Sequence, residues 1–189
     1  MKKVLKLILK VVSALAIAYV VFMTWLAIYY TSWENGKADS INICYSKLTK
    51  ECVAAYIEWD GDAENTTFTV PDEYEGMKVN SLGGLVGMGT PEQFFVMLPE
   101  DMYSGTETCV GMEELAGEAD ENTVAYNFTV KLGKNIKNFE YFVYKDYYMD
   151  DRDKVICTVN IEYEVSPDNK WVYSQDGKIY SKKTNELIE

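Results

Sequence analysis

The feature that most constrains this chain is an uncharged apolar run that begins at Val11 and ends at Tyr30. A helix of about twenty residues rises roughly 30 Å, which is the thickness of the hydrocarbon core of a bilayer. A basic tail over residues 1–10 precedes the run, and every acidic residue follows it, beginning with Glu34. Because basic flanks stay on the cytoplasmic side, we expect a single-pass anchor over residues 11–30 that leaves the C-terminal part extracellular.

A cleavable secretory signal is the alternative interpretation of this N-terminus. Such a signal has an apolar run of about 7–15 residues followed by a small-x-small cleavage site. Ala16 and Ala18 supply the small residues, but the apolar run continues past them. Aromatic residues that favour a membrane interface gather at the far end of the run, namely Trp25, Tyr29, Tyr30 and Trp33. An uncleaved anchor is therefore favoured, whereas cleavage of residues 1–18 would give a secreted protein.

The charge of the chain restricts its partners. Four of its 18 basic residues lie in the N-terminal tail, so 14 basic residues face 30 acidic ones after the apolar run, a formal charge of −16. This charge opposes binding to nucleic acid, whose phosphates require basic neutralisation. The partners that we expect are the lipid bilayer, through the N-terminal helix, and an extracellular protein or glycan.

The absence of histidine from the sequence excludes several chemistries. Histidine-based catalytic triads, histidine metal ligands and the usual proton shuttle near neutral pH are not available. We therefore expect a non-enzymatic protein without catalytic, cofactor-binding or metal-binding residues.

Three motifs that resemble binding loops have simpler interpretations. Residues 60–64 lack the glycine position and the final glutamate of a calcium-binding loop, so a solvated turn is expected. The acidic residues at 146–153 predict a charged loop. The glycines at 83–89 lack the lysine that completes a phosphate-binding loop.

The remainder of the chain predicts a short polar stalk over residues 31–40 and one mainly β domain over residues 41–189. Apolar and polar residues alternate at 124–132 and at 155–165, which is the period of half-buried strands. Shorter strands are expected at 41–45, 53–59 and 93–98, and a short helix at 112–119. The Asp176-Gly177 pair predicts the turn of a β-hairpin.

The cysteines suggest disulfides that suit an exported domain. Cys44 falls opposite to Ile43 in strand phase, and Cys52 opposite to Val53. A hairpin through residues 47–50 would place both sulfurs on one outer face, and a bridge there would contribute about 2.5 kcal/mol. Cys109 and Cys157 would be the remaining pair. Cys157 fits a buried free thiol equally well, and spacing alone leaves the connectivity open.

Three segments, within residues 66–84, 126–139 and 163–188, contain recognisable sequence motifs. They read TFTVPDEYEGMKVNSLGG at 67–84, LGKNIKNF at 132–139 and VSPDNKWVYSQDGKIYS at 165–181. These motifs resemble the BspA-like leucine-rich repeats of bacterial cell-surface proteins. The resemblance implies a leucine-rich-repeat-like extracellular domain that acts in binding or adhesion, and it assigns no functional residue to this chain.

The function that the sequence favours is an anchored, non-catalytic binding module. One alternative is an envelope-anchored hydrolase that uses two carboxylates, one with a raised pKa. A second alternative is a sensor or accessory subunit of a membrane complex. In that case, small residues of the anchor would pack against a partner helix, namely Ser13, Ala14, Ala16 and Ala18.

Overall fold

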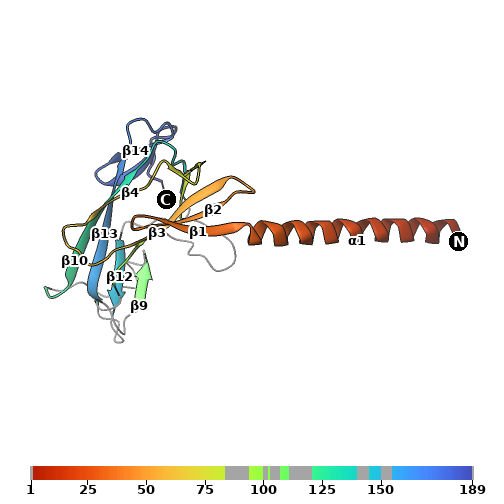
Figure 1. The fold of residues 1–189 in the computed structure, drawn as a ribbon, viewed down its shortest axis with the longest axis horizontal. Helices are drawn as coiled ribbons and strands as arrows, with labels where there is room; N and C mark the ends of the chain where they lie inside the picture. Colours follow the sequence, from red (N-terminus) through yellow and green to blue (C-terminus); the bar gives the residue numbers. More distant parts are fainter. Residues whose placement is uncertain are drawn as a thin grey trace.

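The computed structural model describes residues 2–83, 94–99, 102, 107–110, 121–139, 145–149 and 155–188. One long helix, α1 (Lys2–Thr31), projects from a β-rich domain (Figure 1). The described strands are β1 (Trp33–Ala38), β2 (Ile41–Ser46), β3 (Glu51–Glu58), β4 (Thr67–Thr69), β5 (Glu73–Tyr74), β6 (Met77–Lys78), β7 (Ser81–Leu82), β8 (Val96–Met97), β9 (Glu107–Val110), β10 (Val124–Leu132), β11 (Asn138–Phe139), β12 (Lys145–Met149), β13 (Val155–Val165), β14 (Val172–Gln175) and β15 (Lys178–Ser181). The expected combination of an N-terminal apolar helix and a mainly β domain is confirmed.

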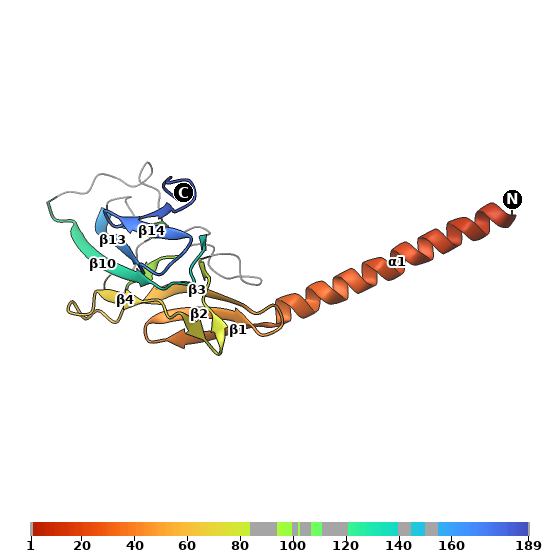
Figure 2. The same cartoon turned by 90° about the horizontal axis from the view of Figure 1, so that it is seen from above.

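Most of the described strands belong to two sheets. One sheet has the order β1-β2-β3-β7-β11, with β8 also paired to β3, and the other has the order β4-β10-β13-β12-β9. The hairpins β5-β6 and β14-β15 form separate two-stranded sheets. The two sheets form separate layers, and β2 and β3 lie below β10 and β13 in Figure 2.

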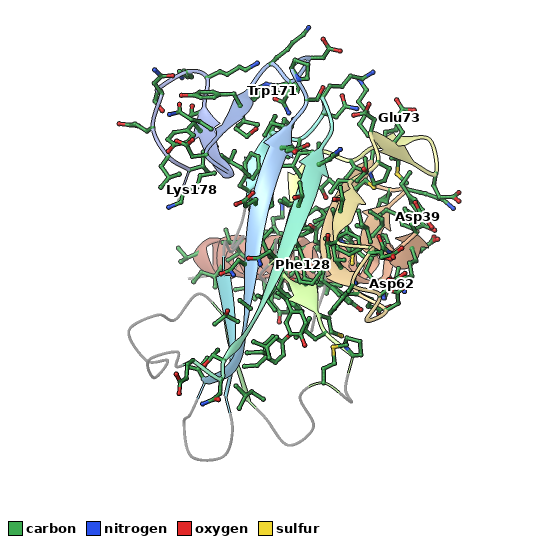
Figure 3. All side chains as sticks on the ribbon, turned by 90° about the vertical axis from the view of Figure 1, so that its left-hand side faces the viewer. Asp39, Asp62, Glu73, Phe128, Trp171 and Lys178 are labelled. Atoms are coloured by element: carbon green, nitrogen blue, oxygen red, sulfur yellow. The ribbon has the colours of Figure 1, made fainter. Side chains whose placement is uncertain are left out.

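A single hydrophobic core joins the two layers. Trp59, which follows β3, packs against Phe128 of β10 with ring centroids 5.1 Å apart. Phe94 packs against Tyr163 of β13 at 6.4 Å. Phe128 is 2% exposed and lies in the interior of the domain (Figure 3). Burial of such aromatic side chains supplies much of the free energy that holds the sheets together.

Three strands that are distant in sequence run parallel in one sheet. The central strand, β10, pairs with β4 on one side, where Val130 faces Phe68, and with β13 on the other, where Leu132 faces Val165. Beyond a corner, β7 and β11 are also parallel, with Ser81 opposite Asn138. The segments 67–82 and 129–139 therefore lie side by side through a strand, a corner and a second strand.

The long strands agree with the sequence pattern. In β13 the odd-numbered residues from Val155 to Tyr163 are buried, and in β10 the even-numbered residues from Phe128 to Leu132 are buried. Asp176 and Gly177 both have positive φ, 52° and 74°, between β14 and β15. This is the geometry of a type I′ turn, so the predicted hairpin is confirmed.

The expected stalk is not observed as a separate segment. Residues 33–38 form β1, which pairs along its whole length with β2, from Trp33 opposite Ser46 to Ala38 opposite Ile41. Only Ser32 separates the end of α1 from the start of β1. Backbone pairing to a neighbouring strand outweighed the polar composition from which the stalk was predicted.

The expected disulfide between Cys44 and Cys52 is also not observed. Cys44 lies opposite Val53, and Cys52 lies opposite Tyr45, so the two thiols point to opposite faces of the sheet. Both are buried and free. Cys52 packs in the main core, whereas Cys44 packs in a small separate cluster with Val53 and Ala55.

A β-bulge explains why the sequence pattern failed here. Ile43 faces Ala54 but Asn42 faces Tyr56, which leaves Ala55 as an extra residue in β3. The spacing of Val53 and Ile57 predicts that their side chains share one face of the sheet. The bulge reverses the alternation between them, so that they lie on opposite faces. The predicted strand at 53–59 requires an unbroken alternation from Val53 through Trp59.

A bridge between Cys109 and Cys157 is excluded by strand order. Cys109 lies in β9 and Cys157 in β13, and β12 separates these two strands. Strands two places apart lie about 10 Å from each other, whereas a disulfide requires Cα atoms within about 7 Å. Cys157 is buried in the core as a free thiol.

The predicted helix at 112–119 and most of the glycines at 83–89 lie outside the described residues.

Candidate functional site

The first functional element is the apolar helix. Within α1, the segment Ile8–Thr31 is long and apolar enough to cross a membrane, and none of it is buried against the domain. This segment contains the predicted anchor from Val11 to Tyr30. Its threonines satisfy their hydroxyls within the helix, since Thr24 donates to the carbonyl of Val20 at 2.8 Å and Thr31 to that of Ala27 at 2.8 Å. The helix could anchor in a membrane, and a signal sequence near an N-terminus would meet the same criterion of length and composition.

The junction between helix and domain is short and structured. The hydroxyls of Ser32 and Ser46 share a hydrogen bond of 2.8 Å, which ties the end of α1 to the end of β2. Aromatic rings continue from the helix into β1, with Trp25 to Tyr29 at 5.6 Å and Tyr29 to Trp33 at 6.2 Å. The domain therefore starts directly at the helix end, without a flexible spacer.

The second functional element is an open groove where the three parallel strands end. It has a volume of about 420 Å³ and is lined by residues 69–72, 131–133 and 164–167, which follow or terminate β4, β10 and β13. Pro71 and Pro167 each close a strand, because proline has no N–H to continue the ladder. The groove is therefore a direct consequence of parallel strands that stop at the same level.

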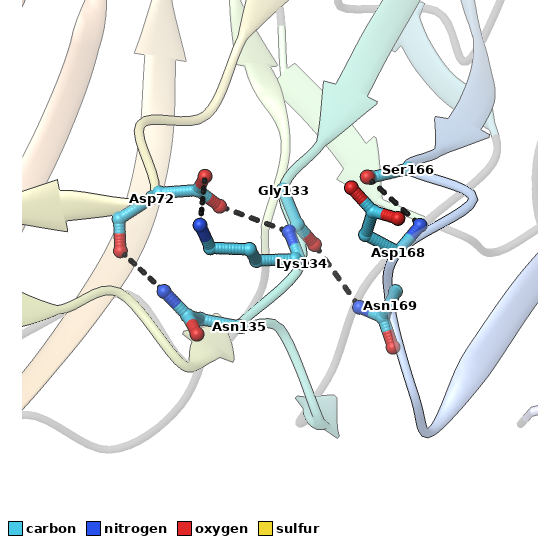
Figure 4. Close-up of polar contacts among 7 residues, drawn as sticks. All are labelled: Asp72, Gly133, Lys134, Asn135, Ser166, Asp168 and Asn169. Carbon is cyan, nitrogen blue, oxygen red and sulfur yellow. Dashed lines mark hydrogen bonds and ion pairs between the residues drawn. The ribbon is translucent and has the colours of Figure 1, made fainter.

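The corner of the groove is fixed by Asp72 and Gly133 (Figure 4). The Asp72 carboxylate accepts a hydrogen bond of 2.9 Å from the backbone N–H of Lys134. The side-chain ammonium of Lys134 lies 3.8 Å from the same carboxylate. The backbone carbonyl of Asp72 accepts a further bond of 3.0 Å from the Asn135 side chain. A Cβ on Gly133 would lie 2.1 Å from Oδ1 of Asp72, so this close approach requires glycine.

Asn169 closes the adjacent corner and is 1% exposed. Its side-chain amide donates to the carbonyls of Gly133 at 3.0 Å and Ile136 at 2.7 Å. Its side-chain oxygen accepts from the backbone N–H groups of Trp171 at 2.9 Å and Val172 at 3.0 Å. One buried side chain thus satisfies four backbone groups that would otherwise be costly to bury.

Charges of both signs border the groove. Lys131 and Glu164 come from neighbouring strands, and their charged groups are 3.7 Å apart with about half of each side chain exposed. Asp72 and Lys134 form a second exposed pair. Surface pairs of this kind contribute little to stability, so the side chains of Lys131 and Glu164 are available to a polar ligand, whereas one oxygen of Asp72 remains bound to the N–H of Lys134.

The sequence did not single out this groove. Its charged residues come from three segments that are separated by about sixty and thirty residues in the chain, from Asp72 to Lys131 and from Lys131 to Glu164. The one available signal was the repeated arrangement of an apolar strand followed by Pro71, Gly133 or Pro167.

The thiols lie in surroundings that suppress their reactivity. Burial raises the pKa of Cys52 to about 11 and that of Cys157 to about 11, and it also raises the pKa of Cys44. A cysteine acts as a nucleophile or metal ligand through its thiolate. These three cysteines are therefore protonated and inert near neutral pH.

Two ionisable groups of the first sheet are engaged by their neighbours. The Lys37 ammonium donates a hydrogen bond to Glu58, which lowers the pKa of that carboxyl. The Tyr45 hydroxyl donates to Glu34 at 2.7 Å, which is the main reason that the pKa of Tyr45 rises to about 12. Glu58 is held ionised, so it is a poor candidate for a general acid.

The acidic turn at residues 60–64 uses its carboxylates to bind its own backbone. Asp60 accepts from the N–H of Asp62 at 3.1 Å, and Asp62 accepts from the N–H of Glu64 at 2.9 Å. Such Asx turns stabilise a loop without a bound ion. Within the described part of the chain, no three histidine, cysteine or acidic residues are grouped so that they could hold a metal ion. Most of the acidic residues at 146–153 lie outside the described residues.

Comparisons with known proteins add no relative. None of the protein-family models, curated proteins or solved structures that were compared with this chain matches it.

Proposed function

We propose that this protein is a single-pass membrane protein whose extracellular β domain binds a protein or glycan without catalysing a reaction. The observation that carries this proposal is the exposed apolar segment Ile8–Thr31, which joins the domain through one residue. An apolar surface of this length is unstable in water and is accommodated by a bilayer. The basic residues that precede the segment favour a cytoplasmic N-terminus.

The groove at the ends of β4, β10 and β13 is the proposed ligand site. Its volume, about 420 Å³, is within the range of pockets that hold small ligands or the side chains of a peptide. Of the residues that line it, Lys131 offers donors, and Asp72 and Glu164 offer acceptors. This pairing suits an extended polar ligand, such as a loop of another protein or a glycan, better than a uniformly charged one.

Binding without catalysis is supported by the state of the ionisable groups. The buried thiols have raised pKa values, and Glu58, the carboxyl with a shifted pKa among the described residues, is stabilised in its ionised form. A carboxylate-dependent hydrolase would instead need one carboxyl with a raised pKa beside a second carboxylate.

The parallel stacking of segments 67–82 and 129–139 supports the proposed relationship to BspA-like leucine-rich repeats. Solenoid repeats place equivalent strands side by side in this way. In this chain the stacked segments are sixty residues apart, and they form part of two sheets that share one core. We therefore propose a short repeat-like unit built into a β domain.

Membrane topology is tested by proteolysis of intact cells that express the full chain. We expect external protease to remove the domain while the segment from Met1 to Tyr30 stays in the membrane fraction. A soluble product without residues 1–18 would show that the N-terminus is a cleaved signal. A domain that is protected until the cells are lysed would contradict the proposed orientation.

Ligand binding at the groove is tested with the full chain in detergent against arrays of glycans and peptides. Glu164→Lys reverses one groove charge, and Glu121→Lys makes the same change before the opposite end of β10. We expect a ligand of the native protein to be lost by Glu164→Lys and retained by Glu121→Lys. Equal binding by both variants would place the ligand elsewhere.

A further inference from the structure

The turn between β2 and β3, residues 47–50, lies beside the C-terminal end of α1. Strand β1 leads away from the helix and β2 returns antiparallel to it, so that Ser46 lies opposite Trp33 at the very start of β1. Figures 1 and 2 both show this hairpin end next to the point where the helix enters the domain. The turn therefore extends past Trp33, back toward the membrane-facing side.

The depth of the turn follows from strand and helix geometry. Leu48 is two residues beyond Ser46, which corresponds to about 6 Å along a strand. The same distance along α1 covers about four residues, which places Leu48 level with Tyr29 and Tyr30. These tyrosines belong to the aromatic group at the end of the apolar segment, where a bilayer interface is expected.

The chemistry of the turn suits a lipid surface. Leu48 is 56% exposed, and beyond α1 the other large apolar side chains exposed in the described residues are Val124, Trp171 and Leu187. Lys47 and Lys50 flank it and are both exposed. An apolar tip between two ammonium groups can insert a side chain below the headgroups while the lysines contact phosphates.

The turn is held in a defined shape. The backbone N–H of Lys50 donates to the carbonyl of Ser46 at 2.8 Å, and Lys50 adopts a positive φ of 58°. The acidic groups nearby are engaged, since Glu34 accepts from the Tyr45 hydroxyl and lies 3.8 Å from Lys47, and Glu51 accepts from Thr49 at 2.7 Å. The hydrogen bond between Ser32 and Ser46 fixes the turn relative to the helix.

We propose that the β2–β3 turn docks on the surface of the same phospholipid bilayer that α1 crosses, with Leu48 at the boundary between headgroups and acyl chains. This inference rests on the proposed membrane anchor. The helix and the turn would then form two contacts, which fix the tilt of the domain and hold the groove at a constant orientation above the membrane.

The test places a fluorescent probe at position 48 in the full chain, reconstituted in phosphatidylcholine vesicles that carry a quencher at headgroup level or, in a parallel set, deep in the acyl chains. Cys109→Ser removes the one cysteine whose side chain the structure does not describe, and the other three are buried. Leu48→Cys then provides the labelling site. Phe22→Cys, near the middle of the apolar segment, reports insertion of α1 through the acyl-chain quencher, and Val124→Cys reports an exposed position at the far end of β10.

We expect the probe at position 48 to be quenched severalfold more than the probe at position 124, with a blue-shifted emission. In vesicles that also contain phosphatidylglycerol, we expect this quenching to increase, and Lys47→Glu/Lys50→Glu to abolish the increase. Quenching at position 22 with none at position 48 would overturn the docking and leave the anchor intact. Absence of quenching at position 22 would overturn the anchor, and with it the docking. Equal quenching at positions 48 and 124 would indicate non-specific adsorption and overturn the docking.

Discussion

At the residue scale, Gly133 shows how closely the corner of the groove is packed. The Asp72 carboxylate occupies the space that a side chain at position 133 would need, and it is held there by the N–H of Lys134. This contact requires both an acceptor side chain at position 72 and the absence of a side chain at position 133. Stability and groove shape therefore depend on the same contact.

Gly133→Ala is expected to destabilise the domain by about 1–3 kcal/mol, because the new methyl group displaces Asp72 and breaks its bond to Lys134. Urea unfolding of the full chain in detergent, followed by tryptophan fluorescence, measures the change. In an Asp72→Ala background the same glycine substitution should cost clearly less. Equal costs in both backgrounds would show that the contact with Asp72 is unimportant.

The buried thiols predict a loss of stability at alkaline pH. In the unfolded chain a thiol ionises near pH 9.0, whereas Cys52 and Cys157 in the folded domain stay protonated until about 11. Between these values the unfolded state has released protons that the folded state retains, so the free energy of unfolding falls as pH rises. We expect a fall on the order of 2 kcal/mol per thiol.

Unfolding measured between pH 8 and 11 tests this effect. The variant Cys52→Ala/Cys157→Ala should be less stable at pH 8 because it leaves cavities, but its stability should decline less steeply with pH. Tyr45, with its pKa raised to about 12, adds a further decline above pH 10 in both proteins. Parallel pH profiles would contradict the assignment to the thiols.

At the scale of elements, Asn169 connects the corner after β10 with the start of β14. Its four hydrogen bonds satisfy backbone groups after the end of β10 and at the start of β14, where no strand pairing is present to do so. The connection places the β14–β15 hairpin beside β13, where the N–H of Tyr163 donates to the carbonyl of Gly177 at 2.7 Å. A single buried amide therefore positions a whole hairpin.

Asn169→Ala is expected to cost about 2–4 kcal/mol, since it leaves two carbonyls and two N–H groups without partners in a buried corner. Asn169→Asp keeps the acceptors but places a charge beside the carbonyls of Gly133 and Ile136, so it should be at least as harmful. The exposed Asn127, whose side chain accepts one bond of 2.9 Å from Asn160, is the control. Asn127→Ala should change the free energy of unfolding by less than about 1 kcal/mol. Similar costs at both positions would refute the structural role of Asn169.

At the scale of the whole molecule, both sheets share one core, so the domain should unfold as a single unit. Phe128→Ala removes a ring that contacts Trp59 and Phe68, and it should cost about 3–5 kcal/mol. Tryptophan fluorescence and far-ultraviolet circular dichroism should give coincident transitions in urea. Val124→Ala, at the exposed end of the same strand, should have little effect. Two separate transitions would show that the sheets are independent.

Much of the fold follows from local sequence patterns. Long alternating segments predicted β10 and β13, and the Asp176-Gly177 pair predicted the β14–β15 hairpin. An apolar run after basic residues predicted α1. These features depend on side-chain periodicity, proline and glycine chemistry and length, which act within a few neighbouring residues.

Tertiary pairing decided what these patterns left open. The bulge at Ala55 reversed the phase of β3 and separated Cys44 from Cys52, and pairing with β2 turned the expected stalk into β1. The groove required β4, β10 and β13 to align in register across more than ninety residues of chain. Local composition determines which segments can form a strand, but only the neighbours of a strand determine its register, its faces and the residues that meet at its ends.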